Sequence, residues 1–400
     1  MTNLLSRTPM RAVLAAALLV LAACSQPSQK DIDGKALLDA SRGDDLGKVK
    51  ALIAKGTDVN WKNDAGATPI LVASQQGNLD VVNALIAAHA NVSARTTDAA
   101  GVLPLTLAAD GGYTQVVNAL IAAGADPNLA ENGIGGTALM RATATDHAET
   151  VNALLAAHAK VDGRRPDGFT ALMSAADKGA NDVLAILIKA GADVNAQTKQ
   201  GATPLMFAVQ GARLDALRAL IAAGAEIDKP STAGVTPLML SAQDDQPEIM
   251  RALIEAGANP NARTGIGETA MMMAAAHGSE APFNILLEKG ADINAKSKNG
   301  VTALMLAAHS GEANIVYQLV QAHADLETRT NGLGETALML AAEAGKIDAV
   351  RTLIEAKADV NAKTTEHPGR TAIDLAKAGG HDDVVTALAA AGGHAGLASE

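Results

Sequence analysis

Aromatic side chains and cysteine are the scarcest features of this 400-residue chain. One Trp, two Tyr and three Phe make up 2% of the residues, whereas about a fifth are alanine and 48% are hydrophobic. Small apolar side chains without aromatics predict a thin core between closely spaced elements, and the hydrophobic fraction excludes a disordered chain. The single cysteine, Cys24, excludes a disulfide scaffold and a zinc cluster built from thiolates.

The chain also lacks an excess of positive charge. Its formal net charge is -11 at pH 7. Binding to nucleic acid needs basic patches, and binding to single strands also needs aromatic platforms on which bases stack. The composition therefore argues against a nucleic-acid partner.

No hydrophobic run is long enough to span a bilayer, but a short one lies near the start. Residues 12–23 read AVLAAALLVLAA and follow Arg7 and Arg11. An uncharged run of this length after a basic start is typical of a secretory signal peptide. It ends in Leu21-Ala22-Ala23-Cys24, which resembles the lipobox of bacterial lipoproteins. The alternative is an ordinary signal peptidase site beside a chance cysteine.

The lipobox resemblance implies that Cys24 carries a diacylglyceryl thioether and an amide-linked acyl chain such as palmitate. Two or three acyl chains anchor a protein firmly, whereas one does not. Ser25, rather than Asp, follows the cysteine, which implies the outer membrane of a bacterial envelope, with the protein facing the periplasm. The expected segments are a signal peptide at 1–23, the lipidated cysteine and a polar tether at 24–33, repeats at 34–393 and a flexible tail at 394–400.

The remainder of the chain repeats itself every 33 to 35 residues. The pattern G-x-T-[PA]-[LIM] gives the register, with its glycines at Gly66, Gly101, Gly135, Gly168, Gly201, Gly234, Gly267, Gly300, Gly334 and Gly369, after a weaker opening copy at Gly34. A second phrase follows each glycine by about 23 residues, as in AGADPN at 123–128 and AGADVN at 190–195. Such a period is the mark of a repeat architecture.

Together the two phrases resemble the ankyrin repeat. The resemblance implies an all-α solenoid of about eleven helix-turn-helix repeats with β-turn fingers. One copy supports it physically, because Thr203 suits a helix N-cap and Pro204 suits the first helical position. A second helix at about Asp215–Ala223 ends at Gly224, which favours a left-handed turn. Stacked copies then bury the apolar faces that one copy cannot bury alone.

The chain departs from the family pattern at three kinds of position. Methionine stands where the family has a hydrogen-bonding histidine, at Met140, Met173, Met206, Met239, Met272, Met305 and Met339. We expect these thioethers only to fill space in the core. Histidine replaces the turn glycine at His89, His158 and His323, where we expect a tolerated left-handed backbone. Arg141 stands where most copies have an apolar residue, and its role is left open between a functional and a local structural one.

Ankyrin proteins bind other proteins through the concave groove, the finger tips and the exits of the inner helices. Carried over repeat by repeat, the resemblance implies that a partner protein contacts Ile134, Phe169, Asp177, Lys178, Gln210, Gln243, Asp244, Ile266, Glu268, His277, His309, Leu333, Glu335 and Glu343. The apolar tips and Phe169 could equally pack within the molecule. The carboxylates favour a basic patch on the partner.

The sequence predicts a non-catalytic interaction scaffold, held by lipid in the envelope. No catalytic residue, cofactor or metal is predicted, because no catalytic motif occurs and His277 and His309 lack a third ligand. Two other functions remain open. One is a structural envelope rod without a single partner protein, and the other is a small-molecule binder or enzyme.

Overall fold

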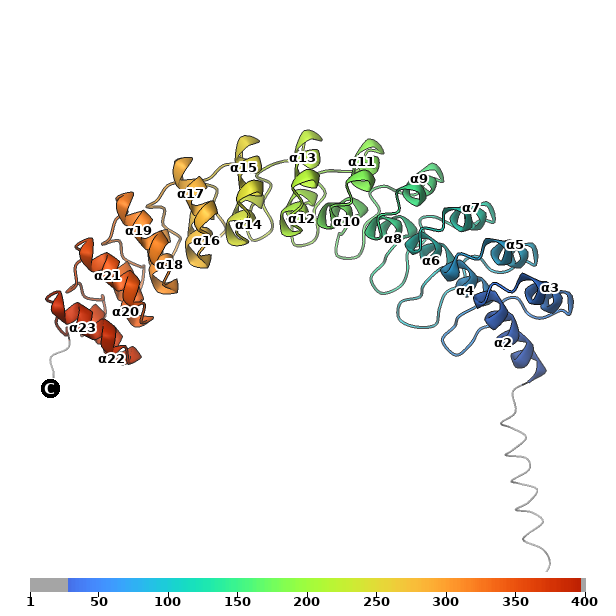
Figure 1. The fold of residues 1–400 in the computed structure, drawn as a ribbon, viewed down its shortest axis with the longest axis horizontal. Helices are drawn as coiled ribbons and strands as arrows, with labels where there is room; N and C mark the ends of the chain where they lie inside the picture. The colour runs from blue at the N-terminus through green and yellow to red at the C-terminus, as the bar shows by residue number, and fades with distance from the viewer. Residues whose placement is uncertain (1–27, 397–400) are drawn as a thin grey trace, which may run out of the picture. The chain divides into compact units, whose positions relative to one another are not determined.

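The computed structural model describes residues 28–396, and these form 22 α-helices and no strand. The chain divides into two compact units, Met1–Lys160 and Val161–Glu400, coloured blue to green and green to red in Figure 1. In each unit, inner helices alternate along the chain with outer helices, and each inner helix packs against its own outer helix. The predicted all-helical repeat architecture is confirmed.

The first unit holds four helix pairs. Its inner helices are α2 (Gln29–Arg42), α4 (Pro69–Gln76), α6 (Pro104–Asp110) and α8 (Ala138–Ala144). Its outer helices are α3 (Leu46–Ala54), α5 (Leu79–Ala87), α7 (Thr114–Ala122) and α9 (Ala148–Ala156). Successive inner helices contact one another, as do successive outer helices, which gives two parallel rows.

The second unit holds seven pairs in the same arrangement. Its inner helices are α10 (Ala171–Lys178), α12 (Pro204–Gln210), α14 (Pro237–Gln243), α16 (Ala270–His277), α18 (Ala303–Ser310), α20 (Ala337–Glu343) and α22 (Ala372–Gly379). Its outer helices are α11 (Asn181–Lys189), α13 (Leu214–Ala222), α15 (Pro247–Glu255), α17 (Glu280–Glu288), α19 (Ala313–Gln321), α21 (Ile347–Glu355) and α23 (Asp382–Ala390). The loops that precede the inner helices are the fingers.

The start of the inner helices follows from their threonines. Thr203 is the N-cap of α12, and its hydroxyl accepts a hydrogen bond from the backbone N–H of Met206 at 3.3 Å. Pro204 occupies the first helical position, where its missing N–H costs nothing. The outer helix α13 spans Leu214–Ala222, within one residue of the predicted bounds. Leu217 and Leu220 on this helix are 0% exposed, as its amphipathic spacing predicts.

The seven methionines that replace the family histidine lie in the core, as predicted, with exposed fractions of 0 to 7%. The expectation that their sulfurs only fill space is wrong in at least three repeats. Met173 Sδ accepts a hydrogen bond from the backbone N–H of Thr170 at 3.4 Å, and Met239 and Met339 do the same for the N-cap residues of α14 and α20. The physical reason is that the N-cap N–H has no partner in the helix, and a side chain three residues later can reach back to it.

The histidines at the turn position have left-handed backbones, as predicted. Their φ angles are 64° at His89, 63° at His158 and 62° at His323, beside 87° at Gly224. A Cβ built on Gly224 meets no atom within 4 Å. The site therefore has room for a side chain, and histidine costs only its backbone strain there.

Helix α2 begins at Gln29, within the segment predicted to be a tether. Ser28 caps the helix, and the Lys55 ammonium lies 2.7 Å from the Asp33 carboxylate. Residues 29–33 are therefore part of the first helix. At the other end, within the predicted tail, the backbone N–H of His394 donates to Asn361 Oδ1 at 3.0 Å.

The predicted signal peptide, Cys24 and residues 397–400 lie outside the described residues. From Ser28 to Gly396, no helix is both long enough and apolar enough to cross a bilayer.

Candidate partner-binding surface

A ladder of side-chain hydrogen bonds fixes each finger loop to the next. The last residue of the A-D-x-N phrase accepts a bond from a backbone N–H one repeat later, as Asn195 does from Glu226 at 2.8 Å and Asn261 from Asp292 at 2.8 Å. The same bond forms at Asn60, Asn128, Asp162, Asp228, Asn294, Glu327 and Asn361. Among the described copies of the phrase, only Ser93 makes no such bond. The ladder holds the fingers in register.

Neighbouring finger tips are also joined through their backbones. The Lys298 N–H donates to the Ile266 carbonyl at 2.8 Å, and the Thr365 N–H donates to the Leu333 carbonyl at 2.8 Å. A Cβ on Gly201 would lie 2.6 Å from the backbone nitrogen of Thr232. The glycine of the repeat pattern is therefore required for this close approach, as well as for its φ of 78°.

Apolar side chains are left half-buried on the inner helices of the second unit. On five successive inner helices, α12, α14, α16, α18 and α20, the fourth residue after the N-cap threonine forms what we call the inner row, which consists of Phe207, Leu240, Met273, Leu306 and Leu340. At the two ends of the second unit the same position is buried, at Ser174 on α10 and Leu375 on α22. The residues that directly precede the inner row, such as Met206 and Met239, are fully buried. Because successive inner helices are in contact, these five side chains lie along one face. A continuous row of partly exposed apolar side chains is typical of an interaction surface.

A small hollow interrupts the inner row between α14, α16 and α18. Its volume is about 170 Å³, and it is lined by Gln243, Glu268, Met272, Met273, Ala276, His277 and Leu306. Three of the residues predicted from the sequence, Gln243, Glu268 and His277, are thus brought together. The backbone N–H of Glu268 donates to Thr264 Oγ1 at 3.0 Å, which fixes the finger beside the hollow.

A second predicted group meets at the fingers that precede α20 and α22. Burial raises the pKa of the Glu335 carboxyl, the charges of Glu343 and Glu366 raise it further, and Arg370 and His309 oppose them. The hydrogen bond to Glu366 raises the pKa of the Arg370 guanidinium. Sequence reasoning found Glu335, Glu343 and His309 but missed Glu366 and Arg370, which occupy a finger of irregular length.

Phe169 lies against the inner helix rather than at a free tip. Its ring meets that of Phe207 edge to face, with centroids 5.2 Å apart, and the Arg165 guanidinium lies 5.1 Å from the Phe169 ring centroid. Both rings are half-buried. Phe169 therefore packs within the molecule, against an inner helix and not another finger, and its contact with a partner stays a prediction.

The other predicted residues are exposed or paired locally. Exposed fractions are 52% at Ile134, 57% at Ile266 and 44% at Leu333. Ile134 belongs to the first unit, whereas every other predicted residue in the described part of the chain belongs to the second. Asp177 and Lys178 form an ion pair with each other at 3.3 Å. Gln210 and Asp244 are exposed at the ends of their inner helices.

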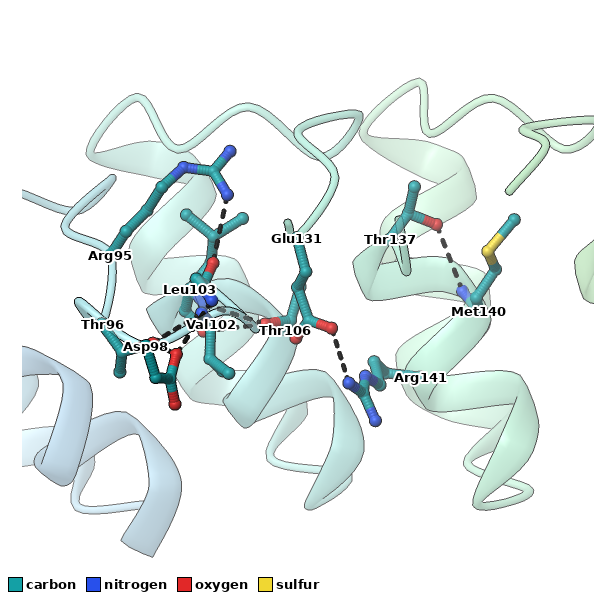
Figure 2. A network of polar contacts seen from close by, with 11 residues as sticks. Arg95, Thr96, Asp98, Val102, Leu103, Thr106, Glu131, Thr137, Met140 and Arg141 are labelled. Atoms are coloured by element: carbon teal, nitrogen blue, oxygen red, sulfur yellow. Dashed lines mark hydrogen bonds and ion pairs between the residues drawn. The ribbon is translucent and has the colours of Figure 1, made fainter. Parts of the chain in front are cut away.

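Arg141 has a local structural role. Figure 2 shows its guanidinium meeting the carboxylate of Glu131, at 2.5 Å. The Glu131 side chain is 2% exposed. Glu131 and Thr264 occupy equivalent finger positions in their repeats. In both, the backbone N–H donates to the carbonyl of the residue that precedes the N-cap threonine. Sequence reasoning noticed Arg141 but missed Glu131. The available signal was that one repeat carries an acidic and a basic residue at two positions where other repeats have uncharged residues.

Within residues 28–396, no three His, Cys, Asp or Glu side chains are grouped so that they could hold a metal ion. His277 and His309 are both exposed.

Comparison with known proteins agrees with the repeat. A family model of three ankyrin repeats matches residues 37–131, 130–198, 191–264, 238–330 and 304–396. The human mitochondrial disaggregase is 42% identical over 78 residues, which is 20% of this chain and 11% of that protein. Its bovine counterpart is 38% identical over 78 residues, with the same coverage. The similarity therefore spans only a small part of these relatives.

Proposed function

Because the chain belongs to the ankyrin repeat family, we propose that its second unit is a docking surface for a partner protein, formed by the inner row and the fingers beside it. Ankyrin repeats generally bind proteins, and the family is generally non-catalytic. The half-buried inner row carries the proposal, because five successive repeats of the second unit each present one apolar side chain that the packing of the chain covers only in part.

Charge around the inner row supports a basic partner. Glu268, Glu335 and Glu343 lie on or beside this face, while the exposed Lys178 is already paired with Asp177. Carboxylates around an apolar row would attract a basic surface and speed association, whereas buried apolar contacts would supply most of the affinity.

The docking surface is tested by measuring the affinity of a partner captured from the native envelope. Leu240→Ser and Leu306→Ser should each weaken the purified complex at least tenfold, because central apolar contacts dominate binding energies. The matched controls Arg218→Ala and Arg251→Ala, on outer helices, should change the affinity less than twofold. The proposal fails if the controls abolish binding and the inner-row variants do not. A structural envelope rod would instead give no saturable complex.

We also propose that the protein is anchored by lipid on Cys24, at the outer membrane facing the periplasm. The run of apolar residues before the only cysteine supports this. Cys24→Ala should move the mature protein from the membrane fraction to the soluble fraction, or stall its processing, and a labelled fatty acid should mark the wild type alone. Equal labelling of the variant would contradict the anchor.

A further inference from the structure

We propose that the hollow between α14, α16 and α18 binds the side chain of a lysine or arginine that is flanked by apolar residues in an extended segment of the partner. This inference rests on the proposed docking surface and specifies the chemistry that it recognises. It concerns one position, Glu268 and its surroundings, within the second unit.

The lining of the hollow matches a long cationic side chain. Met272, Met273 and Leu306 form its apolar part, and Gln243, Glu268 and His277 supply its polar groups. Lysine and arginine combine an aliphatic stem with a charged head, so the stem can lie on the apolar part while the head meets the carboxylate. The volume of about 170 Å³ suits one side chain rather than a folded element.

The carboxylate of Glu268 is available to a partner. No ion pair or hydrogen bond engages it within residues 28–396. The hydrogen bonds that join Glu268 to Thr264 involve only the backbone N–H and carbonyl of Glu268. The equivalent finger residue two repeats later, Glu335, has both the acids Glu343 and Glu366 and the bases Arg370 and His309 in its surroundings, and it does not line the hollow. A half-buried carboxylate on a fixed finger loses little freedom when a cation binds. Glu268 is therefore the carboxylate that can meet a cation held in the hollow.

The finger residues in the repeats before and after Glu268 determine which partner residues can flank the basic one. Val235 and Val301 hold the equivalent finger positions one repeat before and one repeat after, and both are half-buried. Packed helices lie about 8–10 Å apart. In a polyproline II segment, residues three apart share a face and are separated by about 9 Å. The expected motif therefore has an apolar residue three positions before and three positions after the basic one.

The test uses two peptides with the mature chain. The first is acetyl-Leu-Pro-Pro-Arg-Pro-Pro-Leu-amide with a fluorescent label, and the second has Glu in place of Arg. The Arg peptide should bind at least tenfold more tightly. Glu268→Gln should remove this preference, and Glu268→Lys should reverse it. The matched control Glu335→Gln should retain it, and circular dichroism should show every variant folded.

Any other outcome contradicts the proposal that the hollow binds a lysine or arginine side chain. Equal affinity for both peptides, a preference that survives Glu268→Gln, or no binding of either peptide would all contradict it. An apolar occupant of the hollow would show as equal affinity that Leu306→Ser abolishes, and in that case the docking surface stands. The docking surface itself is judged by the captured partner and the inner-row variants, so the two proposals can fail separately.

Discussion

In the first unit, the fourth residue after the N-cap of α8 is Arg141, which pairs with the buried Glu131. On α12, α14, α16, α18 and α20 of the second unit, the same position holds Phe207, Leu240, Met273, Leu306 or Leu340, and each of these apolar side chains is half-buried, as Leu107 is on α6 of the first unit. One repeat thus uses the position for an internal ion pair, whereas six others leave an apolar side chain half-buried there. The comparison teaches that this position can contribute to the proposed docking surface only where the repeat does not already use it for an internal contact.

Converting α8 to the apolar pattern should have the largest effect on stability. Arg141→Leu leaves the Glu131 carboxylate buried without its partner, which costs about 1–3 kcal/mol of unfolding free energy. The double variant Arg141→Leu with Glu131→Thr should recover most of this loss, because Thr264 fills the same finger position in the second unit and its hydroxyl accepts an N–H bond.

Urea unfolding of the wild type, both single variants and the double variant gives the coupling energy between the two side chains. If the double variant is as unstable as Arg141→Leu alone, the loss of stability does not come from leaving Glu131 without its ion-pair partner. The control is Leu240→Ala in the second unit, where no buried charge is exposed and only a half-buried apolar contact is lost.

The hydrogen-bond ladder gives a second, smaller contrast between the units. It is continuous along the second unit, but Ser93 interrupts it in the first, since its hydroxyl is too short to reach the backbone N–H of Asp126. Ser93→Asn should restore the bond and stabilise the protein by about 1 kcal/mol. Amide hydrogen exchange at Asp126 should slow in this variant.

The matched reverse change is Asn195→Ser, which removes an observed bond of 2.8 Å to the Glu226 N–H. It should cost a similar amount and speed exchange at Glu226. A contradicting outcome is that Asn195→Ser destabilises the protein while Ser93→Asn leaves amide exchange at Asp126 unchanged. In that case another group already accepts a hydrogen bond from the Asp126 N–H, and the missing bond at Ser93 does not lower stability.

Features that depend on local backbone chemistry could be predicted from the sequence. Thr203 and Pro204 start a helix because of the orphan N–H groups there, and the left-handed turns at His89 and Gly224 follow from their place in the repeat. The period then predicts the stacking, because each copy has the same apolar face. These inferences need no knowledge of distant contacts.

Features that depend on two side chains in different elements could not be predicted in the same way. The pairing of Glu131 with Arg141 and the edge-to-face contact of Phe169 with Phe207 each join a finger to an inner helix, and only the structure shows that the groups meet. The early start of α2 was missed because Ser28 and Asp33 lie before the first recognisable repeat. The candidate residues were therefore placed on the correct elements, but their partners were not.

The smallest effect is expected from Glu335, whose surroundings differ from those of Glu268. Its pKa in the folded chain is raised above the ordinary value of 4.5, chiefly by burial. A raised pKa means that the folded state prefers the protonated acid, so the ionised group opposes folding at neutral pH and this penalty is relieved as pH falls through the raised pKa. Glu335→Gln should therefore stabilise the protein at pH 7, by less than about 1 kcal/mol, and the gain should vanish in acid.

Asp325 is the opposite control, because the hydrogen bond from the Thr328 hydroxyl lowers the pKa of its carboxyl. Asp325→Asn should destabilise the protein at pH 7, and that loss should fade as pH falls through the lowered pKa. Urea midpoints measured from neutral to acid pH test both signs, and a gain for Glu335→Gln that grows on acidification would contradict the buried-carboxyl argument.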